Sequence, residues 1–185
     1  MCLKRANEIL INPVAAIKQA KKEKKMNTTL CMLIFEWFLI ALGTFLLLKK
    51  LVVATTFFFL GIVGSLFLGF LVQLVFTILG GKGRYFEGLT SVVYSLLPMS
   101  AAVILSSIFV HLPVIGVLLS FVVAVLFVLT GLAVMYRAVK ELFSTDMITT
   151  LVGMGILGGG IVLAFYFAFF EFIAVNPTVF APLIT

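Results

Sequence analysis

Long hydrophobic runs, separated by short polar segments, make up the chain after its first 28 residues. A helix needs about 20 apolar residues to cross the hydrocarbon core of a membrane, within a workable range of about 17–25. Lysines, glycines or a proline mark the ends of the runs, and most of the runs have this length. The pattern predicts five transmembrane helices, over about 29–48, 52–79, 89–110, 114–136 and 147–170.

The fold class that follows is an all-α integral membrane protein. We expect residues 1–28 to form a basic tail with a short amphipathic helix, and residues 29–175 to form the five-helix bundle. Residues 176–185 are then a short tail outside the membrane. Pro98 lies inside the third predicted span, where its missing N–H predicts a kink or a local break.

The composition of the whole chain also indicates an integral membrane protein. Apolar residues make up 63% of the sequence and charged residues only 11%, against about 45–50% and about 25% in a soluble domain. A soluble fold of this size needs a polar exterior that these residues cannot supply. Lipid must therefore surround most of the chain, and no second soluble domain is expected.

The distribution of lysine and arginine predicts how the bundle is threaded through the membrane. Seven of these residues precede the first span, two lie in the loop near residue 83 and two follow the fourth span, whereas Lys49 and Lys50 lie at the opposite end. Short cytoplasmic loops carry the excess of positive charge in membrane proteins. We therefore expect the N-terminus in the cytoplasm and the C-terminus outside, or in a lumen, and the cell membrane as the location if the protein is prokaryotic.

The basic tail contains a helix signal of its own. Asn12 can cap a helix that begins at Pro13, a favourable first position for proline, and Val14 and Ile17 follow at helical spacing. One interpretation is a helix lying on the inner leaflet with its apolar side down and its lysines among anionic head groups; the other is a merely solvated tail. The lysines expected to contact lipid are Lys18, Lys21, Lys22 and Lys25.

Glu36 is the one acidic residue well inside a predicted span. An ionised carboxylate there is costly, so we expect Glu36 to face the bundle interior or to be protonated. A functional group for ion coupling and a purely structural glutamate both fit this position. The possible partners in other spans are Gln73, Ser106, Ser107 and Thr130.

Small residues four apart indicate where helices approach each other closely in lipid. Such pairs are Ser65 and Gly69, Ala102 and Ser106, Gly116 and Ser120, and Gly155 and Gly159. The glycine-rich stretch from Gly153 to Gly160 predicts either a tight packing face or a flexible segment, and we favour the packing face.

No cluster of residues indicates an enzyme, a metal site or a cofactor. The cytoplasmic loop formed by Gly80, Gly81, Lys82, Gly83 and Arg84 lacks the spacing and the Ser/Thr of a nucleotide-binding loop. The basic tail carries no interleaved aromatics of the kind that bind nucleic acid. Cys2 and Cys31 both belong to the reducing side of the predicted topology, so a disulfide is not expected.

Three segments together resemble the Yip1-domain family. They are Asn12-Pro13-Val14-Ala15-Ala16-Ile17, then Leu79-Gly80-Gly81-Lys82-Gly83-Arg84-Tyr85-Phe86-Glu87-Gly88-Leu89, then Val92-Val93-Tyr94-Ser95-Leu96-Leu97-Pro98. The resemblance runs from about Ile9 to Phe170 and implies a five-helix domain with a cytosolic N-terminus. Eukaryotic members bind Rab GTPases in vesicle traffic, whereas this chain lacks their long N-terminal region and is more similar to compact prokaryotic members.

Two functions fit these observations. The first is a non-enzymatic membrane scaffold or trafficking-type protein that acts through contacts with anionic lipids, with protein partners or with a second copy of itself. The second is a small transporter or channel subunit that uses Glu36 as its titratable group.

Overall fold

A computed structural model describes the course of residues 2–112 and 115–175, and the side chains of residues 5–112, 115–164, 166 and 167. Within these residues the chain is helical throughout and forms no strand. The predicted outer tail, 176–185, lies outside the described residues. The helices are α1 (Cys2–Ile11), α2 (Pro13–Glu23), α3 (Met26–Leu48), α4 (Leu51–Ile78), α5 (Tyr85–Phe109), α6 (Gly116–Phe143) and α7 (Met147–Val175).

The five predicted spans are confirmed as α3 to α7. All five are long and apolar enough to cross a membrane. Several helix ends differ from the prediction, because helices continue past the last apolar residue: α6 runs seven residues beyond Tyr136, through Arg137 and Lys140, to Phe143. Charged residues end an apolar run but do not end a helix, since lysine and arginine are good helix formers.

The outer surface of the spans is apolar, as a lipid-facing surface must be. Phe59, Leu60 and Phe67 on α4 and Phe121 on α6 each expose about two-thirds of their surface. Water-facing surfaces of monomeric proteins rarely carry contiguous apolar patches of this kind. This chain is therefore a multi-pass membrane protein.

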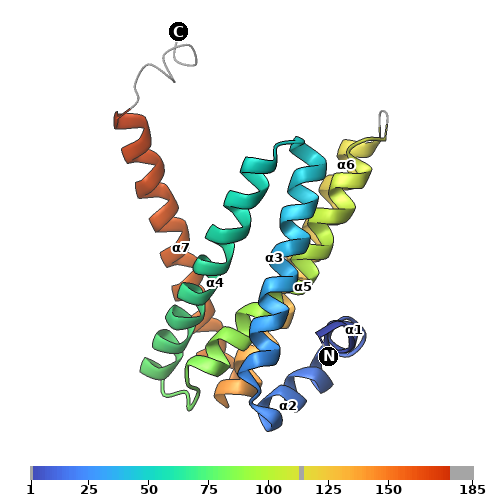
Figure 1. Ribbon diagram of the computed structural model, residues 1–185. Coiled ribbons are helices and arrows are strands. Elements are labelled where there is room, and N and C mark those ends of the chain that lie inside the picture. Colours follow the sequence, from blue (N-terminus) through green and yellow to red (C-terminus); the bar gives the residue numbers. More distant parts are fainter. Residues whose placement is uncertain (1, 113–114, 176–185) are drawn as a thin grey trace.

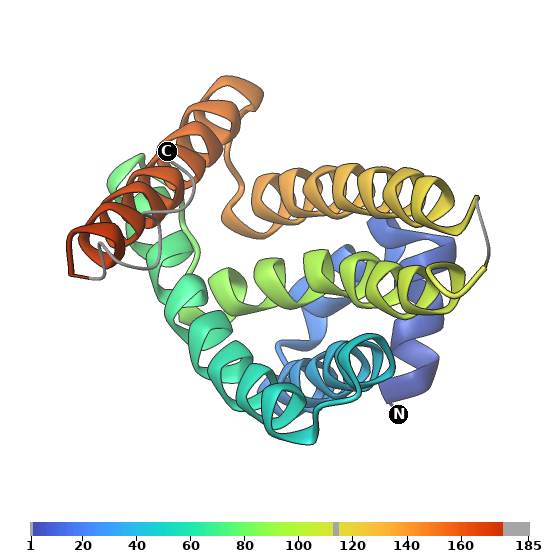
Figure 2. The ribbon, with the colours of Figure 1, turned by 90° about the horizontal axis from the view of Figure 1, so that it is seen from above.

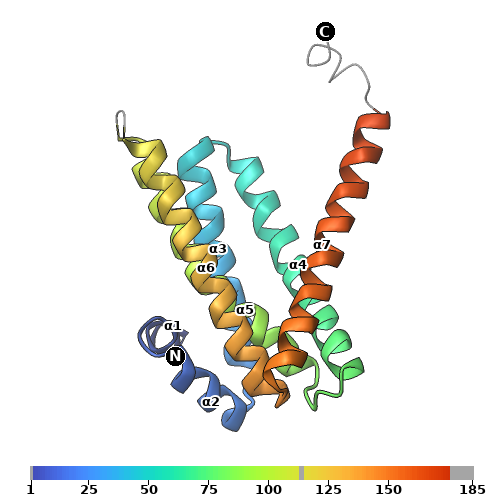
Figure 3. The same ribbon diagram turned by 180° about the vertical axis from the view of Figure 1, so that it is seen from behind.

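The spans alternate in direction between neighbours in sequence, so their connections collect at two ends (Figure 1). The α4–α5 loop, the α6–α7 connection and the helices α1 and α2 share one end (Figure 3), which we call the basic end. The loop with Lys49 and Lys50 lies at the opposite end, with the last turn of α5 and the first turn of α6. The arrangement agrees with the predicted threading, in which the N-terminus and both basic loops share one side.

Close contacts of α4 with α3 and α5 use a row of small residues. A Cβ atom on Gly61 would overlap the ring of Trp37, and the indole nitrogen of Trp37 donates to the Ser65 hydroxyl at 2.8 Å. A Cβ atom on Gly69 would lie 2.9 Å from the Cα of Leu89. The predicted small pair of Ser65 and Gly69 is thus part of the packing face of α4.

The contact between α5 and α6 contains the next two predicted pairs. Ser106 donates to the carbonyl of Ser120 at 3.2 Å, and Ser120 donates back to the carbonyl of Ser106 at 3.0 Å. Such a reciprocal pair requires the two backbones to approach closely. Pro98 lies inside α5, which continues through it as one helix, so the alternative of a local break is wrong.

The expectation that Gly155 and Gly159 form a packing face is wrong. A Cβ atom on Gly155, Gly158, Gly159 or Gly160 would meet no atom within 4 Å, whereas Gly153 lies against the ring of Phe76. Helix α7 contacts α4 near the basic end and diverges from it toward the other end (Figure 3). The sequence shows where small residues lie four apart, but it does not show in which direction a helix tilts relative to its neighbours.

The expectation that no disulfide forms is also wrong, since Cys31 is disulfide-bonded in the structure. Helix α1 packs against α3, the helix that carries Cys31. This tertiary contact brings the N-terminal segment beside the first turns of α3, which a count of two distant cysteines could not predict.

Candidate functional site at the basic end of the bundle

Helix α1 lies across the side of the bundle. It is seen end-on in Figure 1 and along its length in Figure 2, so it runs roughly perpendicular to the spans. Ala6 and Ile9 are buried against the bundle, whereas Leu10 and Ile11 at its end expose 54% and 76% of their surface. The sequence pattern did not predict this helix, which has the orientation of an interfacial helix.

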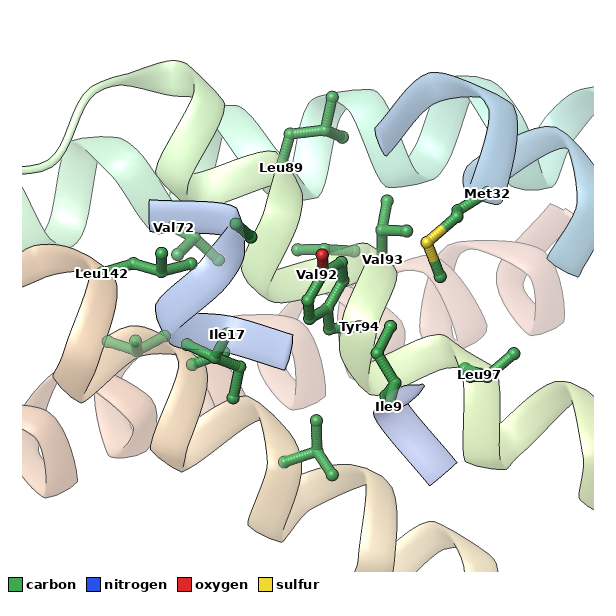
Figure 4. Close-up of a cluster of buried hydrophobic side chains, with 14 of the residues drawn as sticks. Ile9, Ile17, Met32, Val72, Leu89, Val92, Val93, Tyr94, Leu97 and Leu142 are labelled. Carbon is green, nitrogen blue, oxygen red and sulfur yellow. The ribbon is translucent and has the colours of Figure 1, made fainter. Parts of the chain in front are cut away.

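Helix α2 begins as predicted, because the Asn12 side chain accepts a hydrogen bond from the N–H of Ala15 at 3.2 Å. Its apolar residues Ala16, Ile17 and Ala20 are buried in the protein core. Figure 4 shows Ile17 in the hydrophobic cluster with residues of α5 and α6. The apolar side of α2 therefore faces the bundle, and the interpretation that it rests on lipid is wrong.

A cluster of ion pairs ties α1 to α2. The guanidinium group of Arg5, which is buried, lies 2.9 Å from a carboxylate oxygen of Glu23 and 3.3 Å from one of Glu8. Lys25 is 3.7 Å from the same oxygen of Glu23. Removing one partner of a buried ion pair leaves an uncompensated charge, so this cluster fixes the angle between the two helices.

The lysines predicted to contact lipid divide into two kinds. Lys21 is half-buried, and its ammonium group donates to the Glu141 carbonyl and, at 2.8 Å, to the Ser144 hydroxyl at the end of α6. Lys18, Lys22 and Lys25 are exposed. Lys21 thus holds α2 on α6, while Lys18 and Lys22 can reach a ligand outside the protein and Lys25 is exposed beside its Glu23 partner.

The glycine-rich loop between α4 and α5 wraps around the ring of Phe143. A Cβ atom on Gly83 would lie 2.3 Å from this ring, and the N–H of Lys82 donates to the Phe143 carbonyl at 3.0 Å. Gly80 has a φ of 86°, a backbone conformation that favours glycine. These contacts give the loop a structural role in joining the α4–α5 and α6–α7 connections.

Glu87, at the start of α5, connects this loop to the tail. Its buried carboxylate accepts a hydrogen bond from the N–H of Arg84 at 2.8 Å and lies 3.1 Å from the ammonium group of Lys24. The first contact caps α5, since a helix N-terminus has unpaired N–H groups. The second contact brings the residues after α2 to the start of α5.

Glu36 lies on the inward face of α3, one turn after Met32 and Leu33, and it is fully buried. The expectation that it faces the bundle interior is confirmed.

None of the four residues predicted as partners of Glu36 forms a hydrogen bond with it. The hydroxyls of Ser106, Ser107 and Thr130 donate to backbone carbonyls, and Gln73 lies in the α4–α5 contact. Among the described residues neither carboxylate oxygen of Glu36 has a hydrogen-bond partner. Such an unsatisfied buried group in a native protein marks a strained or functional position.

The order of these features agrees with one family of membrane proteins. Residues 7–170, nearly the whole chain, match the Yip1 domain. This chain belongs to the Yip1 domain family. No curated protein and no solved structure matches it. The family resemblance inferred from the three sequence segments is confirmed.

The ion pairs of this Yip1 domain make the docking of α1 dependent on pH. A side-chain hydrogen bond from Gln19, together with the charge of Arg5, lowers the pKa of Glu23 from its ordinary value of 4.5. A lowered pKa in the folded state stabilises the fold above the ordinary value, and this contribution is lost as the pH falls through the folded value. We expect α1 to lose protection from amide exchange, relative to α5, when the pH drops below 4.5.

Glu23→Gln tests this expectation. The variant should show weaker protection of α1 at neutral pH, with no further loss in acid once intrinsic exchange rates are corrected. Equal behaviour of wild type and Glu23→Gln at both pH values would show that the ion pairs do not hold α1 in place.

Proposed function

We propose that this Yip1-domain protein is a non-enzymatic membrane-organising protein whose basic end gathers anionic lipids. The observation that carries the proposal is the placement of α1. It crosses the bundle at the end that contains the tail and both basic loops, and it leaves Leu10 and Ile11 exposed there.

Charge and apolar surface act together in this arrangement. Lys18, Lys22 and Lys25 are exposed on the docked tail, and each basic residue near an anionic membrane surface contributes about 1 kcal/mol of binding. Because α2 is fixed to α6 through Lys21 and Ile17, these lysines are held at the bundle rather than on a loose tail. In this proposal the basic end faces the cytoplasm, in accordance with the positive-inside rule.

The test measures which lipids surround the protein. The full chain is extracted in polymer-bounded native nanodiscs, and the lipids are quantified by mass spectrometry. We expect anionic lipids to be enriched over the bulk membrane, and the triple variant Lys18→Gln/Lys22→Gln/Lys25→Gln to lower their share toward the bulk value. Point substitutions are preferred to truncation, because Ala16 and Ile17 belong to the core.

The opposite end of the bundle provides a matched control. Lys49→Gln/Lys50→Gln removes two exposed cations there and should leave the lipid composition unchanged. Equal loss of anionic lipid in both variants would indicate a response to net charge alone, and no enrichment around wild type would overturn the proposal.

A second candidate function is favoured by the burial of Glu36. An unpartnered carboxylate inside a membrane bundle is suited to bind and release a proton or a cation. A small transporter or channel subunit of this kind would show pH-dependent flux in liposomes.

A further inference from the structure

A groove at the basic end lies between α2 and α6. Its volume is about 240 Å³, and α2 packs directly on α6 beside it. The groove combines an apolar wall with charged side chains. It is lined by Val14, Ile17, Tyr136, Arg137, Lys140 and Glu141.

Two cations of the groove are not used by the protein itself. Arg137 and Lys140 stand three residues apart, on one side of α6, and both are exposed. Neither of them forms a salt bridge with any of the described residues, whereas Arg5, Lys24 and Lys25 each have a carboxylate partner. Glu141 also lines the groove, so the two cations exceed its single carboxylate by one positive charge, which is available to a ligand.

The groove also lies at the depth of a lipid head group. Arg137 is 21 residues from Gly116 at the start of α6, a distance of about 30 Å at 1.5 Å per residue. This length equals the thickness of the hydrocarbon core, about 30 Å. With Gly116 at one boundary of the hydrocarbon core, Arg137 and Lys140 would lie at the other, with Tyr136 beside them in the position where aromatic residues meet the interface.

We propose that this groove binds the phosphate group of one anionic phospholipid. Arg137 and Lys140 bind the phosphate, and Val14 and Tyr136, which are partly exposed, contact the glycerol and the first carbons of the acyl chains. Basic pockets between helices on the cytoplasmic side are the form in which membrane proteins hold such head groups. The inference rests on the proposed lipid-gathering function but assigns a discrete site to it, on residues other than the exposed tail lysines.

The experiment uses the full chain, delipidated in detergent, and titrates it with phosphatidylglycerol or with phosphatidylcholine under native mass spectrometry. We expect one phosphatidylglycerol to be retained per chain, with about 30-fold preference over phosphatidylcholine, because two cations contribute. Arg137→Gln/Lys140→Gln should abolish the preference, while the charge-conserving Arg137→Lys/Lys140→Arg should keep it. Equal retention of both lipids by wild type would overturn the proposal.

Two further measurements identify the cause if a variant loses lipid retention. Val14→Trp fills the groove without changing its charge, and it should abolish retention with an unchanged lipid-free melting temperature. Soluble glycerol phosphate should not compete; competition would show a site for free phosphate and would overturn the assignment to a lipid. If both Val14→Trp and Arg137→Gln/Lys140→Gln retain the lipid, the groove is not its site.

The tail variant separates this inference from the proposed function. Lys18→Gln/Lys22→Gln/Lys25→Gln should lose the general enrichment in nanodiscs but keep the single retained phosphatidylglycerol. Enrichment around wild type without a retained lipid would overturn the groove alone. A chain that neither enriches nor retains anionic lipid would overturn both.

Discussion

We expect Gly88→Ala to separate α4 from α5 and to destabilise the bundle by about 3 kcal/mol, the upper end of what an overpacked core usually costs. A Cβ atom on Gly88 would lie 2.3 Å from the carbonyl oxygen of Gly69 and 3.1 Å from the backbone nitrogen of Gln73. Both are backbone atoms, which cannot move aside as the end of a side chain can.

The displacement would reach the centre of the core. Leu89, Val72 and Phe76 are buried at this contact, with exposures of 1% or less, and their packing depends on the close approach of the two helices. In lipid no hydrophobic effect pulls helices together, so packing supplies much of the attraction that is lost. The free energy of unfolding, measured by titration with a denaturing detergent in mixed micelles, should therefore fall in Gly88→Ala.

Gly64→Ala is the matched control on α4. A Cβ atom at Gly64 would meet nothing within 4 Å, so the change affects helix propensity alone, by about 1 kcal/mol or less in favour of alanine. A similar loss of stability in Gly64→Ala and Gly88→Ala would show that the glycine contact between α4 and α5 is not the cause.

The spans could be predicted from sequence because a membrane imposes a length on every crossing helix. The apolar runs therefore located α3 to α7 within a few residues at most ends. The ends that differ most from the prediction, such as the end of α6 at Phe143, are those where the helix continues into the polar region. Hydrophobicity reports where a helix leaves the membrane, not where it stops.

The basic end was harder to predict, because charge patterns do not show which charges are used inside the protein. Lys21 and Lys22 are neighbours in sequence, yet Lys21 donates to the end of α6 while Lys22 is exposed. In the sequence, Arg5 looks like one more positive residue of the tail, but in the structure it is buried in an ion-pair cluster. Only the docking of α1 and α2 on the bundle decides between these roles, and that docking depends on contacts distant in sequence.

Glu36 shows, at a single residue, that the sequence predicts burial better than it predicts side-chain partners. Its place inside a span predicted burial, and the structure confirms it. The partners that were predicted from composition, such as Ser107 and Thr130, instead donate to carbonyls of their own helices. A hydroxyl in a helix always has such a carbonyl within reach, so its presence in a neighbouring span is weak evidence for a contact.

Replacing Glu36 by leucine should stabilise the protein by about 1–3 kcal/mol. A buried polar group without a hydrogen bond costs about that much, and both carboxylate oxygens of Glu36 lack a partner among the described residues. Leucine has a similar volume and no polar atom, so it fits the same place beside Met32 and Leu33 without the penalty. The detergent titration used for the glycine variants measures the change.

Glu87→Leu is the control, because Glu87 is the other buried carboxylate described in the spans and it has partners. Its contacts with the Arg84 N–H and with Lys24 would be lost, so we expect destabilisation where Glu36→Leu stabilises. Loss of stability in Glu36→Leu would contradict the prediction and would mean that the carboxylate is held by contacts in the membrane.

The same variants decide between the two functions proposed for the chain. If Glu36 carries a proton or a cation, liposomes with wild-type protein should show pH-dependent flux, and Glu36→Gln should abolish it while remaining folded. A scaffold instead predicts no flux above that of protein-free liposomes, together with unchanged lipid enrichment in Glu36→Leu. If the Glu36→Leu variant is more stable than wild type and keeps the same lipid enrichment, Glu36 has no role in gathering anionic lipid. That role would then belong to the basic end alone.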